Sequence, residues 1–85
     1  MLFVHLRPFS VRCMIQQELL KRIGQNLTKA RKSRNLSLRQ LSALCTVDHA
    51  HIGKIEKGQS NVTIGTICEL ADALEIDPED LFKFD

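Results

Sequence analysis

Apolar residues recur every three or four positions along most of the chain, which is the spacing of amphipathic helices. The longest such run predicts a helix over residues 16–33, with basic side chains filling its other face. Asn35 follows as a stop, because asparagine tolerates the left-handed backbone conformation that ends many helices. The predicted inward positions of this helix are Leu19, Leu20, Ile23, Leu27 and Ala30.

Side-chain caps predict the starts of three more helices. Ser37 and Gln40 form a capping box before a helix of about two turns. Asp48 precedes a third helix, which ends just before Gly58. The fourth helix follows Thr63, and its expected inward side consists of Ile64, Ile67, Leu70, Ala71 and Leu74.

A last short helix is expected at Pro78, which suits a first helical position, with Glu79 and Asp80 in its first turn. The chain has four Phe and no Trp or Tyr, so aliphatic side chains must build the core. Such a core favours helix packing over a β-sandwich. The 85 residues are enough for one domain. Together these features predict an all-α fold, a compact five-helix bundle.

The first thirteen residues do not continue the helical pattern, and Pro8 would interrupt a helix there. We expect residues 1–13 to form a short strand or apolar tail outside the domain proper, which spans residues 14–85. A strand of this kind could instead pair with its counterpart in a second chain. No apolar run approaches the roughly 20 residues that span a bilayer, so we expect no membrane contact. Three cysteines that act as ordinary thiols fit a reducing environment, so we expect a cytoplasmic location.

Charge is distributed unevenly along the chain. Residues 14–35 contain six basic side chains and one acid, whereas residues 59–85 contain seven acids and one base. A basic half of this kind can meet phosphate while the acidic half faces away or binds a partner. Two solvated helix faces would give the same pattern, so charge by itself leaves both explanations open.

The sequence offers little catalytic or metal-binding chemistry. Cys13, Cys45 and Cys68 are odd in number and far apart, which indicates neither a zinc site nor a disulfide framework. The latter two fall at apolar positions of predicted helices, where a thiol behaves as a small hydrophobe. No glycine-rich phosphate loop, G-x-S-x-G or H-E-x-x-H motif is present. We therefore expect no enzyme activity, no cofactor and no metal.

The most informative segment is residues 36–58, which predicts two short helices joined by a tight turn, a helix-turn-helix over about residues 37–57. The second of these helices has only Ile52 and Ile55 as inward residues, and its remaining side chains are polar or very small. Its outer face should therefore project from the body of the domain. A helix about 10–12 Å across fits the DNA major groove, which is roughly 12 Å wide.

The segment carries a recognisable set of spaced residues: Leu36-Ser37, Leu41-Ser42, Cys45-Thr46-Val47 and the run from Ile52 through Ile55-Glu56 to Gly58. In this set the chain resembles the Cro and phage-repressor class of helix-turn-helix domains, also called the xenobiotic-response-element family. The resemblance covers about residues 19–82 and implies a lambda-repressor-like fold. The chain departs from the family pattern at Ser42, Thr46 and Leu38, where the family usually has alanine, glycine and often glutamine. Leu38 cannot make the phosphate contact of that glutamine.

The resemblance implies a transcriptional regulator that binds double-stranded DNA sequence-specifically, with the third helix as its recognition helix. The base-reading positions would be His49, Ala50 and Lys54, flanked by His51 and Gly53. Contacts to the DNA backbone, through side chains or helix amides, are assigned to Ser37, Arg39, Asp48, Lys57, Gln59 and Asn61. The two histidines lie two positions apart on one helix, so they point in different directions and are poorly placed to share a metal.

The resemblance also implies an ion pair between Arg31 and Glu56, which would tie the first helix to the end of the recognition helix. A solvated pair of small energetic worth is the alternative.

A module of this size reads few base pairs, so we expect a symmetric homodimer on an inverted-repeat operator, acting by default as a repressor. The candidate dimer interface consists of Leu74, Ile76, Leu81, Phe82 and Phe84, with the apolar N-terminal tail as a second option. No small-molecule effector site is evident. Controller proteins of restriction–modification systems share this compact form. The alternative is a protein-interaction module on the same fold, such as an antitoxin or adaptor.

Overall fold

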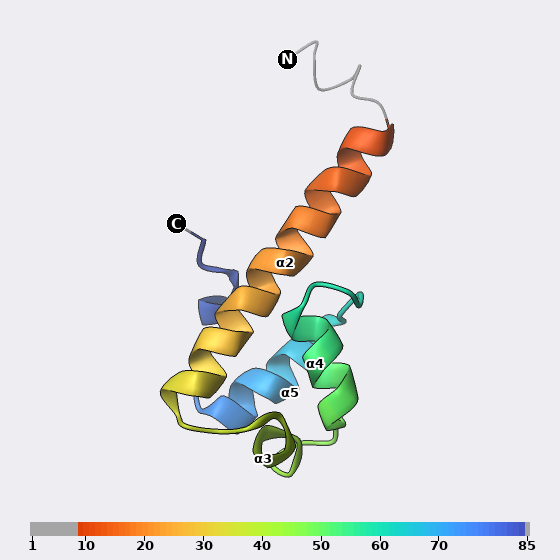
Figure 1. Cartoon of the computed structure of the whole chain (residues 1–85). Helices are drawn as coiled ribbons and strands as arrows, with labels where there is room; N and C mark the ends of the chain where they lie inside the picture. The colour runs from red at the N-terminus through yellow and green to blue at the C-terminus, as the bar shows by residue number, and fades with distance from the viewer. Residues whose placement is uncertain (1–8, 85) are drawn as a thin grey trace.

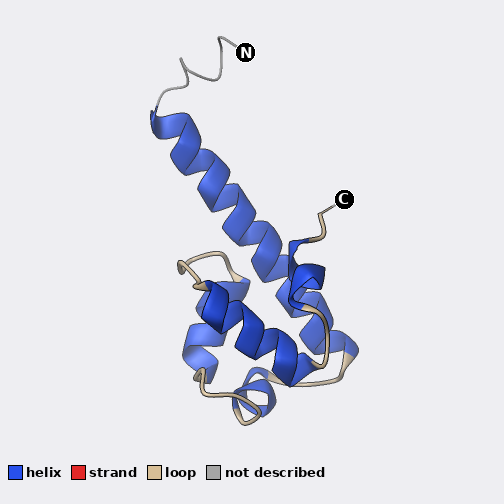
Figure 2. Cartoon of the chain, turned by 180° about the vertical axis from the view of Figure 1, so that it is seen from behind, coloured by secondary structure: helices blue, strands red, loops and turns tan. Residues whose placement is uncertain are grey.

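The structure is a computed structural model that describes residues 9–84. Its elements in chain order are α2 (Phe9–Ser33), α3 (Leu38–Ser42), α4 (His49–Glu56), α5 (Ile64–Leu74) and the 3₁₀ helix η1 (Pro78–Phe82). Figure 1 shows the shorter helices gathered against the C-terminal half of α2, whose N-terminal half projects beyond them. Seen from behind, every described element is helical (Figure 2). The predicted all-α class is confirmed for these residues.

The expected five-helix bundle needs two corrections. The described residues contain four α-helices, and the fifth predicted helix is the 3₁₀ helix η1. Asp77 caps η1 with no side-chain hydrogen bond, and the backbone is already extended at Lys83, so no α-helical turn is completed. The first helix also begins at Phe9, well before residue 16, so residues 9–13 are helical and do not form a strand. The prediction for residues 1–8 lies outside the described residues.

The core is aliphatic, as the scarcity of aromatic residues required. Its buried members are Ile23, Leu27, Leu41, Val47, Ile52, Ile55, Ile67, Leu70, Ala71, Leu74 and Leu81. Three positions predicted to face inward do not. Leu19, in the N-terminal half of α2, is 43% exposed, and Ile64, the first residue of α5, is 69% exposed. Cys68 is also exposed, whereas Cys45 is half-buried against the core.

The capping residues chosen from the sequence act as predicted. The Ser37 hydroxyl accepts a hydrogen bond from the Gln40 amide at 3.0 Å, and the Gln40 side chain accepts one from the Ser37 amide at 2.7 Å. The Thr63 hydroxyl accepts from the Thr66 amide at 3.1 Å. Such caps satisfy amides that have no partner inside the helix, and each contributes about 1 kcal/mol to stability.

Three helices end on a residue with left-handed backbone. These residues are Asn35 after α2, Gly58 after α4 and Glu75 after α5, with φ values of 58°, 71° and 59°. Only glycine adopts this conformation without steric cost, so Glu75 was not foreseen as a stop. In each case the amide of the residue that follows the left-handed one bonds back to a carbonyl in the last turns of the helix, as from Gln59 to Lys54 at 2.9 Å.

Gly24 allows α2 and α4 to pack backbone against backbone. A Cβ atom added at Gly24 would lie 2.5 Å from the carbonyl oxygens of both Ile55 and Glu56. Those oxygens belong to the last turn of α4, so a larger residue at this position would have to separate the two helices. The glycine fixes how closely α4 approaches α2.

An ion pair also links α2 to the end of α4. Arg31 Nε and Nη2 donate to the two carboxylate oxygens of Glu56 at 2.7 and 3.0 Å, and Nη1 donates to the Leu36 carbonyl at 2.8 Å. The Arg31 side chain is 11% exposed and the Glu56 side chain 9% exposed. The paired carboxylate raises the pKa of Arg31 above its ordinary value. The pair named from the sequence is therefore formed, bidentate and largely buried.

Replacing Gly24 should destabilise the fold although alanine is the better helix former. We expect Gly24→Ala to lose about 1–3 kcal/mol in the free energy of unfolding, because the neighbouring atoms are backbone and cannot move aside. Gly65→Ala is the matched control: its Cβ would meet only the Thr63 hydroxyl at 3.8 Å, so alanine should gain up to about 1 kcal/mol. Chemical denaturation measures both variants. Equal effects at the two sites would contradict the role given to Gly24.

Removing one partner of the ion pair should leave the other as an unpaired charge in a buried site. We expect Arg31→Met and Glu56→Leu each to lose about 3–5 kcal/mol, because an unpaired buried charge is costly. The double variant should lose far less than the sum of the two. A double-mutant cycle from urea unfolding measures this coupling. Small additive losses, under about 1 kcal/mol each, would show that the pair acts as a solvated surface contact.

Candidate nucleic-acid interface

Helix α4 has one anchored side and one exposed side. Ile52 and Ile55, three positions apart, are 0% and 2% exposed and fix the helix to the core. His49, Ala50 and Lys54 lie on the outer face and are exposed to solvent. Because only two side chains hold the helix down, most of its surface is open to a partner. The three residues predicted to read bases therefore share an accessible face.

The two predicted flanking residues lie at the edges of that face. His51 is half-buried, and its Nε2 lies 3.2 Å from the Ser60 hydroxyl in the loop after α4. Gly53 faces the start of α3, where an added Cβ would lie 3.6 Å from Leu38 Cδ1. That distance is an ordinary van der Waals contact, so none of the described neighbours of Gly53 requires glycine at this position.

The N-terminus of α4 is closed by Asp48. Its carboxylate accepts a hydrogen bond from the His51 amide at 2.9 Å, and this bond lowers the pKa of Asp48. A carboxylate used in this way has no hydrogen to offer a phosphate. Asp48 can therefore serve a DNA contact only by ordering the helix start, where backbone amides point outward. The Ser37 hydroxyl has the same capping role at α3.

The other predicted backbone contacts lie at both ends of the helix pair. Arg39 on α3 and Lys57 at the end of α4 are exposed, as are Gln59 and Asn61 in the following loop. The Asn61 side chain accepts a hydrogen bond from Gln16 of α2 at 3.2 Å. Cationic and amide donors thus flank the exposed face of α4, an arrangement that suits phosphate oxygens.

The turn between α3 and α4 accounts for two departures from the family pattern. Ser42, where the family has alanine, donates its hydroxyl to the Val47 carbonyl at 2.8 Å. Thr46, where the family has glycine, donates both its amide and its hydroxyl to the Glu69 carboxylate on α5. These bonds lower the pKa of Glu69. Sequence reasoning missed the Thr46–Glu69 contact, because its partners are 23 positions apart and Glu69 belongs to no motif.

The candidate dimer interface was wrong for two of its five residues. Leu74 and Leu81 are 0% and 1% exposed, because both complete the core and neither reaches the surface. Phe82 is 40% exposed, whereas Ile76 and Phe84 are half-buried. The Arg22 guanidinium lies 5.9 Å from the centre of the Phe84 ring, at cation–π distance.

Neither a metal centre nor a membrane span is found in the described part of the chain. Residues 9–84 contain no group of three or more His, Cys, Asp or Glu side chains placed to hold a metal ion. Within the same residues, no helix is both long and apolar enough to cross a bilayer. What distinguishes the surface is the accessible face of α4 and its flanking donors.

Several known proteins are similar to this chain in sequence and in the arrangement of their helices. Control protein C.BamHI of Bacillus amyloliquefaciens is 34% identical over 62 residues, which are 72% of this chain and 76% of that protein. The crystal structure of the restriction-modification controller protein C.AhdI from Aeromonas hydrophila matches with 38% identity and a TM-score of 0.75, covering 78% of this chain and 96% of that one. An HTH_3 family transcriptional regulator from Vibrio cholerae matches with 36% identity and a TM-score of 0.76, covering 79% of this chain and 38% of that one.

The family comparison agrees with these individual matches. The helix-turn-helix family HTH_3 matches residues 27–81, from the second half of α2 to η1. That range contains the two short helices, their turn and the buried ion pair. The chain therefore belongs to the HTH_3 family of helix-turn-helix DNA-binding transcriptional regulators.

Proposed function

We propose that the protein binds a specific double-stranded DNA operator through the exposed face of α4 and regulates transcription from it. The observation that carries this proposal is the division of α4 into a buried side, formed by Ile52 and Ile55, and an open side bearing Lys54. A helix held this way can enter the major groove without disturbing the core. Membership of a DNA-binding regulator family supports the same conclusion.

Each exposed residue has a chemical role in this proposal. The Lys54 ammonium donates to the O6 and N7 atoms of guanine, and the Ala50 methyl contacts the methyl group of thymine. His49 donates or accepts according to its tautomer. Arg39 and Lys57 contact phosphates on either side of the groove, which positions the domain without reading sequence.

The functional unit is proposed to be a symmetric dimer on an inverted repeat. One α4 helix covers few base pairs, and a two-fold dimer doubles the length of DNA that is read. Of the apolar residues near the C-terminus, Phe82 is the most exposed and Ile76 and Phe84 are partly available, so these three remain the interface candidates. Repression by blocking polymerase is the default mode.

The matched control proteins suggest which genes are regulated. Two of the relatives are named as control proteins, and one of these is named as a restriction-modification controller. We therefore place the operator of this protein upstream of restriction–modification genes.

A protein-interaction module is the second candidate function. The surface of α5 and η1 carries the exposed acids Asp72, Glu75 and Glu79, which would repel DNA and could face a basic partner. Salt separates the two functions. DNA binding must weaken steeply as salt rises, because each neutralised phosphate releases counterions.

Selection from random-sequence DNA tests the proposal directly. We expect an inverted repeat to be recovered, and Lys54→Ala to lose about 1–3 kcal/mol of discrimination against a changed base pair. Lys57→Ala is the matched control, because a phosphate contact should weaken all sequences equally and leave the preference intact. Binding titrations at two salt concentrations measure both effects. If no motif is recovered and binding is weak, the adaptor or antitoxin function is favoured instead.

A substitution at Gly53 gives a second test, because we expect it to maintain or raise stability while it lowers operator affinity. Gly53→Ala should leave the free energy of unfolding unchanged or raise it by up to about 1 kcal/mol, since its methyl group fits against Leu38. Operator affinity should fall at least several-fold, because the DNA approaches the helix backbone at this point. Thermal unfolding and binding titration are the two measurements. Unchanged affinity would show that DNA does not approach Gly53 closely.

A further inference from the structure

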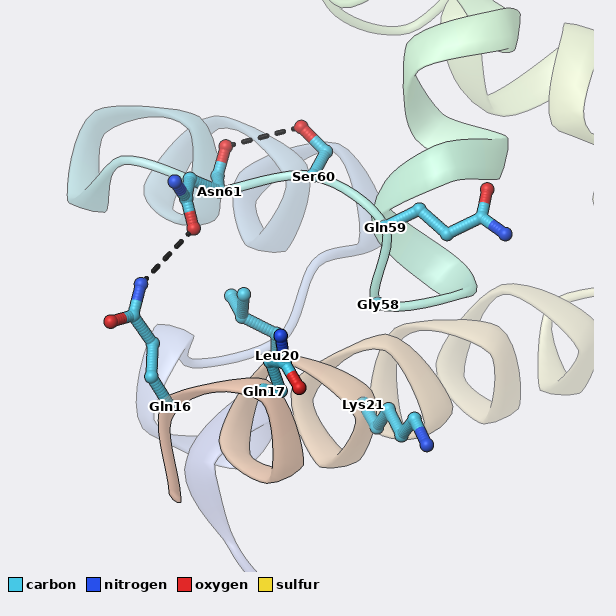
Figure 3. Close-up of a pocket in the computed structure, with 8 residues that line it drawn as sticks. All are labelled: Gln16, Gln17, Leu20, Lys21, Gly58, Gln59, Ser60 and Asn61. Atoms are coloured by element: carbon cyan, nitrogen blue, oxygen red, sulfur yellow. Dashed lines mark hydrogen bonds between the residues drawn. The ribbon is translucent and has the colours of Figure 1, made fainter. Parts of the chain in front are cut away.

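A polar groove lies between α2 and the loop that follows α4. Its volume is about 570 Å³, and its two walls come from residues far apart in the sequence. Figure 3 shows the side chains of both walls around the groove, with the Gln16–Asn61 hydrogen bond joining them at one end. The lining residues are Gln16, Gln17, Leu20 and Lys21 on α2, and Gly58, Gln59, Ser60 and Asn61 on the loop.

The chemistry of the lining favours an anionic, hydrogen-bond-accepting occupant. Four of the lining residues carry side-chain amides, one carries a hydroxyl and one an ammonium group, whereas none carries a carboxylate. The Asn61 carbonyl oxygen is already used as the acceptor for Gln16, which leaves its amide hydrogens for a ligand. Lys21 is exposed and supplies the only formal charge on the lining. Phosphodiester oxygens match this set of donors.

The loop wall of the groove directly follows α4 in the chain. The Gln59 amide bonds to the Lys54 carbonyl at 2.9 Å, so the loop wall begins directly beside the proposed base-reading lysine. The Ser60 hydroxyl lies 3.2 Å from His51 Nε2, which connects the loop to the same helix a second time. The groove therefore adjoins the C-terminal end of α4, where a strand of DNA bound along that helix would pass.

The close packing of Gly58 holds the two walls together. A Cβ atom at Gly58 would lie 2.9 Å from Lys21 Cα, and the left-handed φ of 71° also favours glycine. The loop is thus seated on α2 at the lysine itself. The position of Lys21 relative to α4 is consequently set by the fold and does not depend on a flexible loop.

We propose that this groove binds the sugar-phosphate backbone of the DNA that flanks the bases contacted by α4, with Lys21 and Gln17 of α2 as additional phosphate contacts. The proposal rests on the DNA-binding function given above and extends it to the first helix. The protein footprint then includes phosphates beyond the helix-turn-helix itself. These contacts add affinity and leave sequence preference unchanged.

Lys21→Met tests the lysine, because methionine keeps the aliphatic stem that packs on Gly58 and removes the charge. Lys29→Met is the matched control, since Lys29 is exposed on the same helix but lines a different depression, beside Phe84. We expect Lys21→Met to weaken operator and unrelated DNA by the same factor. The slope of log affinity against log salt should fall by about 0.9, the value for one lost phosphate contact. Lys29→Met should leave the slope unchanged.

Phosphate-ethylation interference on the recovered operator locates the contact. Wild-type protein should be sensitive to ethylation of phosphates flanking the bases that α4 reads, and Lys21→Met should lose that sensitivity. Gln17→Glu provides a second variant, because a carboxylate in the groove should repel phosphate and lower affinity at least several-fold. Thermal unfolding verifies that each variant is folded.

The outcomes separate the groove from the proposed function. If Lys54→Ala loses sequence discrimination while Lys21→Met keeps the wild-type salt slope and interference pattern, the groove proposal is overturned and the DNA-binding function stands. If the wild-type protein recovers no DNA motif, both fail. An amide-lined groove that then binds an extended peptide, measured by titration with peptides from a candidate partner, would also overturn the DNA assignment.

Discussion

The last turn of α4 lies directly on the backbone of α2, and the rest of the structure depends on this contact. Gly24 removes the side chain that would keep the two helices apart, and the buried Arg31–Glu56 pair links them about two turns further along α2. Backbone contact and a bidentate ion pair together leave α4 little freedom to tilt. A recognition helix needs that rigidity, because base contacts demand side chains held within a fraction of an ångström.

The same junction explains how a small domain can expose so much of one helix. Only Ile52 and Ile55 anchor α4 through apolar burial, which would be weak attachment for a helix of eight residues. The N-cap at Asp48, the left-handed stop at Gly58 and the ion pair hold the helix where apolar contacts are few. The side chains on the outer face are therefore not needed to hold the helix in place and are available for binding.

Two features around α4 set this chain apart: the residues that depart from the family pattern in the turn before it, and the polar groove beside the loop after it. Thr46 replaces the usual glycine of the turn and gains a partner in Glu69, which connects the turn to α5. The groove beside Lys21 arises because the loop after α4 is seated on a long first helix. Both features lie around the exposed face of α4, so they adapt the surroundings of that face without altering its anchoring.

The sequence by itself determined the features that depend on neighbouring residues. The caps at Ser37, Asp48 and Thr63, the stop at Gly58 and the aliphatic core of the helix-turn-helix were all predicted, because capping and helical periodicity act within a few positions. Tertiary structure decided whatever requires distant segments to meet. It placed Leu74 and Leu81 inside the core, although both looked like interface residues on their own helices.

The necessity of Gly24, the Thr46–Glu69 contact and the groove between Lys21 and Gln59 also followed only from the fold. Their partners are separated by more than twenty positions, and no local pattern records such a contact. The Arg31–Glu56 pair is equally distant in sequence, yet it was anticipated because a family resemblance carries information about tertiary contacts that the periodicity of a single chain does not. Interactions between neighbouring residues thus determine where the helices begin and end. The packing of those helices determines which of their faces stay exposed to a partner.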